Sequence, residues 1–405
     1  MLRANPRLCG YNLTGMLDHG ITGEGVWTFW RELKPLAADT LRDGWAPLRW
    51  CLFVTPIHGY ADRPIEVEAV LANEDVLPPG EYPVTFRITG VQGVVWERKD
   101  HVIIPQPSAG ERGPLAVPVL KTEVQLDVPP GEYVFAAHLD RGGAPAGDRM
   151  SFTVSPAPVS RPEDARIRVT TWGLDDSLGR WLEEAGLQVR RLEDAPARST
   201  EVILVGLPPE STRDQWVDLA RRIARGSVAV FLQPGAYRYG DDTTFWLPLA
   251  RKGECRQFHD WLYHKECVAK RHPIFDGLQT GGVLDWDYYD QVIGHAFFTG
   301  QDTPDEVVCA AFAPCSQCEI GYQSGVMIGS YQLGAGHFFL NTLNIVEQVD
   351  KHPAADRLLL NLVRHAHTRR QRRVVKLPAD FNSRLNAELY PPPNTSSGTS
   401  VPKER

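Results

Sequence analysis

The chain has 405 residues, and at roughly 100 to 200 residues per domain this length predicts about two to four domains. Apolar residues make up 42 % and charged residues 23 %, as in ordinary soluble proteins, which excludes wholesale disorder and a fibrous repeat. The 43 Lys and Arg residues stand against 50 Asp and Glu residues, so the formal net charge of −7 gives no reason to expect a nucleic-acid partner.

Membrane, secretion and disulfide signals are weak throughout the sequence. No stretch reaches about 18 uninterrupted apolar residues, and the opening MLRANPRLCGYNLTG has no apolar run ahead of a small-residue cleavage site. We therefore expect no membrane partner, no signal peptide and a cytoplasmic location. The seven cysteines are an odd number scattered over a long chain, which disfavours a disulfide framework and favours a reducing compartment.

Residues 1–50 have the pattern of one strand followed by one helix. The stretch CGYNLTGML is suited to a buried strand and runs into the Gly-rich turn DHGITGEG. Leu33, Leu36, Ala37 and Leu41 then recur at near-helical spacing until Gly44 ends the pattern. A lone βα unit cannot bury both faces of its strand, so this one requires parallel neighbours.

Residues 51–157 have the pattern of an antiparallel β-sandwich. Short alternating runs follow one another at roughly ten-residue spacing, separated by Pro and Gly turns. The pentapeptide PPGEY occurs at 78–82 and again at 129–133, each time ahead of a strand. In immunoglobulin-like folds a Tyr at such a corner pins the loop with its hydroxyl, so we expect structural roles for Tyr82 and Tyr133.

A Pro-rich linker at 158–165 leads to a region, 166–368, in which strands and helices alternate. Buried strands such as EVILVGLP and SVAVFLQPG flank the amphipathic helix DQWVDLARRIARG, which predicts a mostly parallel, doubly wound α/β sheet. Residues 369–405 are polar and Pro-rich, so we expect a largely disordered tail. We interpret the arginines at the start of this tail as cations that favour the negative end of a helix dipole and the solvent.

The first segment resembles the last strand and last helix of the catalytic barrel of glycoside hydrolase family 2, the β-galactosidase and β-glucuronidase family. The residues that carry the resemblance are Asn5-Pro6, Gly10-Tyr11, Thr14, Asp18, Gly25, Trp27 and Lys34-Pro35. The resemblance implies a (β/α)8 barrel remnant followed by one of the β-domains typical of that family. It also implies hydrolysis of terminal glycosidic bonds in a carbohydrate substrate, with no cofactor.

The third region resembles the class I glutamine amidotransferase-like fold, as used in the non-catalytic trimerisation domain of other β-galactosidases. The strands 202–205 and 228–232, the turn 272–278 and the strand 334–338 carry this resemblance. It implies a homo-oligomer formed through this flavodoxin-like domain.

A glycosidase needs two carboxylates, about 5 to 5.5 Å apart when retaining and 6.5 to 9.5 Å apart when inverting. A complete barrel needs about 250 residues, and only residues 1–50 precede the sandwich. We therefore expect the catalytic pair to be absent from this chain. Asp18, Glu24 and Trp27 remain as candidate substrate-binding residues, because an indole face stacks on a pyranose and carboxylates accept from hydroxyls.

Simpler roles for the same residues stay open. Trp27, Trp30, Trp45 and Trp50 are also interpretable as packing residues that join the barrel end to the sandwich. The carboxylates of Asp18 and Glu24 are equally interpretable as solvated loop charges.

Three cysteine patterns in the third region have residue types found in chemical sites. Cys255, His259, His264 and Cys267 lie within thirteen residues and are ligand types that hold zinc tetrahedrally, but their spacing matches no known module, so no metal is predicted. The Cys315-Ser316-Gln317-Cys318 motif has no second pair at the usual spacing. Gly253-Glu254-Cys255 is only half of a nucleophile elbow, so amidotransferase catalysis is not predicted either.

The sequence thus predicts the C-terminal portion of a glycoside hydrolase that is inactive alone, because its catalytic carboxylates lie upstream. The alternative is a non-catalytic carbohydrate-binding or oligomerisation module. Whether another polypeptide can complete the barrel separates the two.

Overall fold

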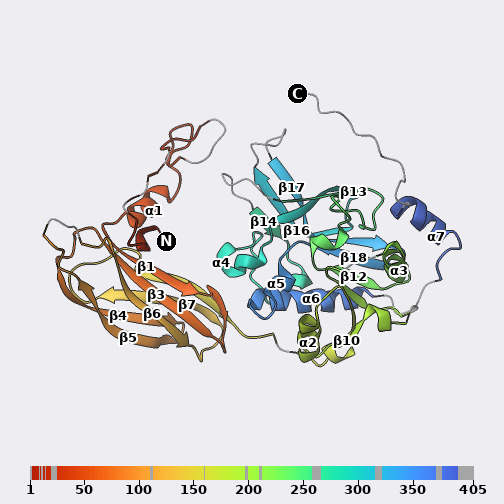
Figure 1. Ribbon diagram of the computed structural model, residues 1–405, viewed down its shortest axis with the longest axis horizontal. Coiled ribbons are helices and arrows are strands. Elements are labelled where there is room, and N and C mark those ends of the chain that lie inside the picture. The colour runs from red at the N-terminus through yellow and green to blue at the C-terminus, as the bar shows by residue number, and fades with distance from the viewer. Residues whose placement is uncertain are drawn as a thin grey trace.

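A computed structural model shows a multi-sheet, mostly β protein with several helices (Figure 1). It describes residues 2–8, 10, 12–13, 15–19, 25–109, 113–158, 160–196, 199–208, 212–257, 266–314, 322–370 and 376–390. Within these ranges, no helix combines the length and the apolar character that crossing a membrane requires.

Two facing sheets make up the part of the chain from 48 to 155, which we call the two-sheet region. The three-stranded sheet has the antiparallel order β1 (Leu48–Thr55), β3 (Pro64–Asn73), β6 (Ala116–Gln125). The five-stranded sheet has the order β2 (His58–Tyr60), β8 (Arg149–Ser155), β7 (Gly131–Leu139), β4 (Gly80–Gly90), β5 (Gly93–Ile104). All neighbours in the second sheet are antiparallel except β2 and β8.

The two sheets share one apolar core. Trp50 of one sheet and Phe86 of the other are both fully buried, and their rings meet edge to face at 5.7 Å. Phe86 also stacks on Phe135 at 6.1 Å. Burying each such side chain contributes roughly 1.5 to 3 kcal/mol. The alternating sequence pattern places these side chains inward, so the predicted strands are confirmed here.

Both PPGEY tyrosines have the structural role that the sequence predicted. The Tyr82 hydroxyl donates to the Pro78 carbonyl at 2.9 Å, and the Tyr133 hydroxyl donates to the Pro129 carbonyl at 2.6 Å. Each bond closes the turn onto the strand that follows it.

A mixed sheet of ten strands fills residues 166–370, which we call the mixed-sheet region. Five parallel strands come first: β10 (Gln188–Arg191), β9 (Arg168–Trp172), β11 (Val202–Val205), β12 (Val228–Phe231), β18 (Gly336–Asn341). Antiparallel strands continue from β18: β17 (Tyr322–Leu333), β15 (Ala296–Gln301), β13 (Lys252–Gln257), with β16 (Glu306–Pro314) on β17 and β14 (Glu266–Ala269) on β16.

Helices cover both faces of the parallel strands. In β11, Val202 and Leu204 pack into one core, which α2 and α6 cover, whereas Ile203 and Val205 pack into the opposite core, which α3 covers. This double burial explains why β11 is a continuous apolar run. The described α-helices of this region are α2 (Asp176–Glu184), α3 (Arg213–Ala224), α4 (Trp286–Tyr289), α5 (Ile345–Gln348) and α6 (Pro353–Arg369). Its 3-10 helices are η2 (Asp164–Arg166), η3 (Leu192–Asp194), η4 (Pro234–Tyr237), η5 (Pro273–Phe275) and η6 (Asp290–Val292).

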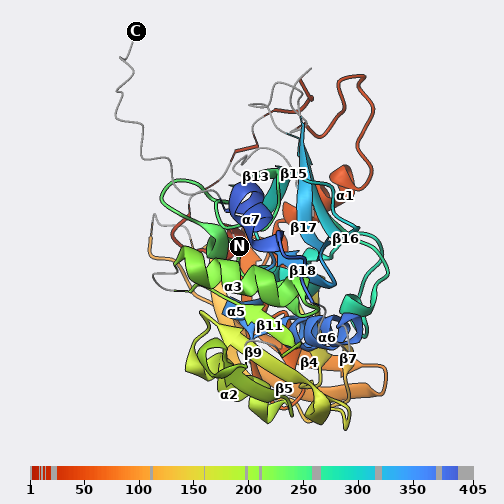
Figure 2. The same cartoon turned by 90° about the vertical axis from the view of Figure 1, so that its right-hand side faces the viewer.

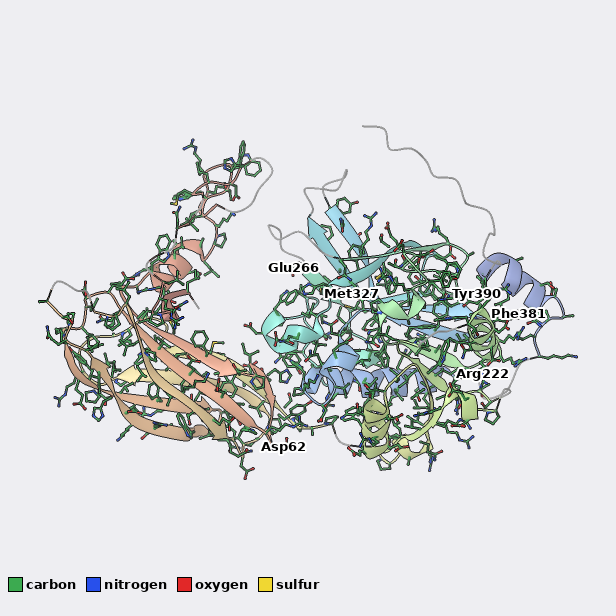
Figure 3. All side chains as sticks on the ribbon, viewed as in Figure 1. Asp62, Arg222, Glu266, Met327, Phe381 and Tyr390 are labelled. Atoms are coloured by element: carbon green, nitrogen blue, oxygen red, sulfur yellow. The ribbon has the colours of Figure 1, made fainter. Side chains whose placement is uncertain are left out.

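Buried polar side chains join the two regions. His58 is 1 % exposed; its Nδ1–H donates to the Tyr288 carbonyl and its Nε2 accepts from the Ser155 hydroxyl, both at 2.7 Å. The Tyr60 hydroxyl donates to Asp356 Oδ2 at 2.7 Å. Figure 3 labels Asp62, next to these residues in the chain, at the place where the two regions meet.

The strand predicted near the N-terminus is wrong for the described residues. Before the two-sheet region these residues form η1 (Leu2–Ala4) and α1 (Ala37–Gly44), while Leu17, Trp27 and Leu33 make only isolated bridges. A lone strand has no partners for its backbone groups, so this segment folds back on itself instead. The predicted helix forms only over α1 and has no buried residue. Cys9, Tyr11 and Thr14 lie outside the described residues.

The prediction of a disordered tail is also wrong for residues 376–390. They form α7 (Phe381–Arg384) and the π-helical turn η7 (Leu385–Leu389), which lie close to α3 (Figure 2). Tyr390 is 3 % exposed and its carbonyl accepts from Arg213 Nη2 at 2.6 Å. The apolar residues of this segment fill the core beside α3, which the polar composition of the whole tail conceals.

The arginines after α6 do more than face the solvent. Arg369 Nη2 donates to Glu306 Oε2 at 2.6 Å, and Arg370 Nη1 donates to the Thr200 carbonyl at 3.3 Å. Our interpretation of these two residues as solvated charges is therefore incomplete, whereas Arg372 and Arg373 lie outside the described residues.

Candidate functional site

Residues 15–19 and 25–36 form a small folded unit, which we call the N-terminal lobe. The Asp18 amide donates to the Trp27 carbonyl at 2.9 Å, the Trp27 amide to the Met16 carbonyl at 3.0 Å, and the Lys34 amide to the Val26 carbonyl at 3.1 Å. A Cβ on Gly25 would lie 2.3 Å from the carbonyl carbon of Leu17, so only glycine permits this approach.

Asp18 fastens the lobe. Its Oδ1 accepts from the Gly25 amide and from Lys34 Nζ, each at 2.8 Å. The hydrogen bond from Lys34 holds the pKa of the Asp18 carboxyl below its usual value. Asp18 is therefore ionised at neutral pH and cannot act as a proton donor there. Glu24, the other predicted carboxylate, lies outside the described residues.

The lobe presents aromatic side chains to solvent. Trp27 is 38 % exposed, Phe29 60 % and Trp30 79 %, and the Phe29 and Trp30 rings meet edge to face at 5.7 Å. Sequence reasoning selected Trp27, yet Trp30 and Phe29 offer more ring surface. The adjacent aromatic residues of the TFW stretch could have indicated an aromatic surface. The sequence alone does not reveal which of two neighbouring aromatic side chains faces the solvent.

The four tryptophans differ in how well they fit the interpretation as packing residues. Trp50 is fully buried between the two sheets, as expected for a packing residue. Trp45 keeps 46 % of its surface exposed, and Trp30 is more exposed still. Part of each of these two side chains is therefore accessible to solvent.

Cys255 lacks the properties of a nucleophile. It lies on β13, and burial raises the pKa of its thiol to about 11. A thiol with that pKa is protonated at neutral pH and reacts slowly. This supports the sequence-based exclusion of amidotransferase catalysis. Cys267 is fully buried on β14, while His259, His264, Cys315 and Cys318 lie outside the described residues, so the zinc and redox patterns are not tested.

One cluster that sequence reasoning missed has metal-ligand residue types. Atoms of His272, Glu306 and His365 lie within 4.8 Å of one another. No sequence spacing could reveal this trio, because it joins the residue before η5, the first residue of β16 and the middle of α6.

The trio does not fit a metal. His272 Nδ1 accepts from the Ile274 amide at 3.2 Å, so in the neutral ring Nε2 carries the proton, and it faces Glu306 Oε1 at 3.5 Å. Lys270 Nζ and Arg369 Nη2 both donate to the Glu306 carboxylate at 2.6 Å. A metal ion would displace the proton of His272 and meet two cations. Burial lowers the pKa of His365 to about 4 and also lowers that of His272, so both imidazoles are neutral at pH 7.

Backbone hydrogen bonds cross the place where an open α/β sheet usually binds its ligand. Such sheets bind ligands beyond the carboxyl ends of strands where the strand order reverses, which is between β9 and β11. At that point the Gly206 amide donates to the Trp172 carbonyl at 2.9 Å and the Leu207 amide to the Gly173 carbonyl at 2.8 Å. The Asp175 carboxylate caps the following helix, α2, which disfavours an anionic ligand there.

Comparison with known proteins adds little. No protein-family model matches the sequence, and no curated protein matches it. One similar solved structure is the alkylpurine DNA glycosylase AlkC of Pseudomonas fluorescens, 16 % identical with a TM-score of 0.19 over 30 % of this chain and 33 % of that one.

Two other neighbours carry the names of carbohydrate-active enzymes. A cycloisomaltooligosaccharide glucanotransferase of Paenibacillus sp. is 11 % identical, with a TM-score of 0.20 over 44 % of this chain and 19 % of that one. The β-glucosidase EmGH1 of Erythrobacter marinus is 14 % identical, with a TM-score of 0.19 over 27 % and 16 %. Such TM-scores do not establish a shared fold, and this chain spans at most about a third of these three proteins. Function is therefore inferred from the residues of this chain.

Proposed function

We propose that this chain is the C-terminal portion of a glycoside hydrolase, similar to family 2, that acts on terminal glycosidic bonds. Residues 1–50 would be the last βα unit of its barrel, 51–157 an immunoglobulin-like domain and 166–368 an amidotransferase-like domain that supports assembly. Both catalytic carboxylates would lie upstream, so the chain alone is inactive.

The exposed apolar surface of the N-terminal lobe and α1 carries this proposal. Trp30 is 79 % exposed and Leu36 75 %, and α1 buries none of its residues. Exposed large apolar side chains of this kind are found at contact sites. In a (β/α)8 barrel the last strand and helix pack between the first and seventh units. A last unit without these neighbours would therefore leave its apolar side chains exposed.

Within the lobe, Trp27 is the proposed sugar contact and Asp18 a positioning residue. An indole face matches the apolar C–H face of a pyranose. Asp18 acts through Lys34 and Gly25, because it holds the strand-like segment that carries Trp27. Glu24, six residues after Asp18 in the sequence, is proposed to accept hydrogen bonds from sugar hydroxyls.

Hydrolysis of chromogenic aryl glycosides tests the proposal. The purified chain would be compared with a version extended upstream to the preceding in-frame start. Activity in the extended protein alone is the expected result. Activity in the 405-residue chain would place the carboxylates within it, and inactivity of both proteins with every glycoside would contradict the proposal.

The second candidate is a non-catalytic carbohydrate-binding or oligomerisation module. The backbone hydrogen bonds across the edge between β9 and β11 and the raised thiol pKa of Cys255 favour it, because neither of these described features offers a catalytic group. Exposed apolar side chains on the β14, β16 and β17 side of that region, including Phe312 and Tyr322 at 46 % each, would support self-association. Light scattering of the purified chain tests this, since a monomer would contradict assembly through this region.

A further inference from the structure

A separate cavity lies between α1 and the two-sheet region. Its volume is about 750 Å³, within the range of roughly 300 to 1,000 Å³ found for small-molecule sites. The chain from Asp39 to Leu48 forms one wall, and Val76 with residues 143–146 forms the other. Neither wall includes Trp27 or Trp30, so this cavity is distinct from the aromatic surface of the N-terminal lobe.

Backbone hydrogen bonds hold the two walls in place. The Trp50 amide donates to the Ala146 carbonyl at 2.8 Å, and the Ala146 amide donates to the Leu48 carbonyl at 3.0 Å. The Glu74 amide donates to the Pro47 carbonyl at 2.8 Å. Arg3 Nη1 adds a bond to the Gly44 carbonyl at 3.2 Å, at the end of α1. The cavity is therefore formed before any ligand enters, which reduces the ordering cost of binding.

The lining combines one aromatic ring with polar groups of both signs. Trp45 is 46 % exposed, and Asp39, Arg42 and Asp43 lie beside it. Asp43 already pairs with Arg49, which stands outside the lining. Gly143, Ala144 and Ala146 also line the cavity and have at most a methyl group each, so they occupy little of its volume.

These lining residues favour a neutral ligand ring that carries several hydroxyl groups. Asp39 and Arg42 offer charges of both signs and Asp43 is already paired with Arg49, so the lining favours neither an anionic nor a cationic ligand. A purely apolar ligand would desolvate Asp39 and Arg42 without replacing their hydrogen bonds. A pyranose satisfies both requirements, because its C–H face stacks on an indole while its hydroxyls donate to carboxylates and accept from a guanidinium.

We propose that the cavity beside Trp45 binds one or two rings of a neutral saccharide. The site deepens the proposed carbohydrate role and rests on it only for the class of ligand. It would hold a substrate or polysaccharide chain at a distance from the chemistry, so it requires neither the barrel nor the catalytic carboxylates. Because the cavity is open to solvent, we expect affinities in the millimolar range for free disaccharides.

Fluorine NMR of the 405-residue chain labelled with 5-fluorotryptophan tests this proposal. The resonance of Trp45 is assigned as the one missing in Trp45→Phe. Lactose, cellobiose, xylobiose and mannobiose are then titrated as probes at millimolar concentration. We expect at least one of them to shift the Trp45 resonance in a saturable way.

Two variants locate the binding. Ala144→Phe fills the cavity without removing a polar group and should weaken binding by roughly tenfold or more. Trp30→Ala is the matched control on the other aromatic surface and should leave the titration unchanged. Thermal unfolding of each variant checks that the chain still folds, and Ala144→Phe retains Trp45 as its own reporter.

The proposal is overturned if no probe shifts the Trp45 resonance, or if Ala144→Phe binds as tightly as the unaltered chain. It is also overturned if Trp30→Ala weakens the titration as much as Ala144→Phe does. These outcomes are independent of the glycoside assay, because a chain that hydrolyses nothing can still bind at Trp45.

Discussion

Tyr60→Phe isolates one hydrogen bond at the junction between the two regions. The Tyr60 hydroxyl donates to Asp356 Oδ2 at 2.7 Å, and the two side chains are 3 % and 2 % exposed. Phenylalanine keeps the ring, so the packing of the Arg63 guanidinium over it, at 4.1 Å from the ring centre, can persist. The substitution therefore removes the hydroxyl and little else.

A buried hydrogen bond to a charged group contributes about 1.5 to 3 kcal/mol, and we expect Tyr60→Phe to destabilise the chain by that amount. Tyr82→Phe is the matched control, because its hydroxyl donates to a neutral, solvent-accessible carbonyl, a bond worth about 0.5 to 1.5 kcal/mol at most. Urea unfolding of both variants supplies the comparison. Equal losses of stability would refute the placement of Tyr60 against an ionised, buried carboxylate.

The pH dependence of the same variant gives a second, independent check. Burial raises the pKa of Asp356 from 3.8 to about 6, which corresponds to about 3 kcal/mol in favour of the protonated form in the folded state. This contribution is complete below about pH 4 and is lost as the pH rises through about 6. The Tyr60 hydroxyl favours the ionised form, so its removal should cost more above that pH than below it. A constant difference between the two proteins across this range would contradict the assignment.

Four further outcomes follow from the described contacts. Burial lowers the pKa of His352 to about 3 and also lowers that of His58. Their contribution to the free energy of unfolding is therefore complete above about pH 6.5 and is lost on acidification. His352→Gln should reduce the loss of stability that the chain shows as the pH falls. Gly25→Ala should disorder the N-terminal lobe, measured as faster amide exchange over 25–36, whereas Gly113→Ala, which meets no atom within 4 Å, should not. Arg213→Ala should release residues 376–390 to proteolysis while the core melts as before, because Tyr390 loses its anchor. Cys255 should resist iodoacetamide at neutral pH, and rapid alkylation would contradict a thiol pKa of about 11.

Local patterns predicted the elements that are stabilised by near neighbours in sequence. The alternation Tyr133, Phe135, Ala137, Leu139 points one face of β7 inward, and each of these residues is at most 5 % exposed. The apolar run of β11 likewise indicated a strand buried on both faces. In these cases the residues that determine the structure are the residues that form the pattern.

The predictions were wrong for segments whose structure depends on contacts with residues distant in the sequence. The stretch around Leu17 has strand-like composition, yet no neighbouring strand is present to accept its hydrogen bonds, and it pairs with Trp27 instead. Tyr390 lies in a polar tail, and it is ordered by Arg213, 177 positions earlier in the chain. The His272, Glu306 and His365 cluster joins three elements, and only the structure shows that Lys270 and Arg369 already neutralise its carboxylate.

Buried polar contacts determine how the two regions are held together. Apolar contacts alone tolerate sliding, but His58 must satisfy the Tyr288 carbonyl and the Ser155 hydroxyl at the same time, since a buried polar group left unpaired costs about 1 to 3 kcal/mol. The Tyr60 hydroxyl adds a bond to Asp356 across the same junction. His58 and Asp356 therefore select one orientation of the two regions.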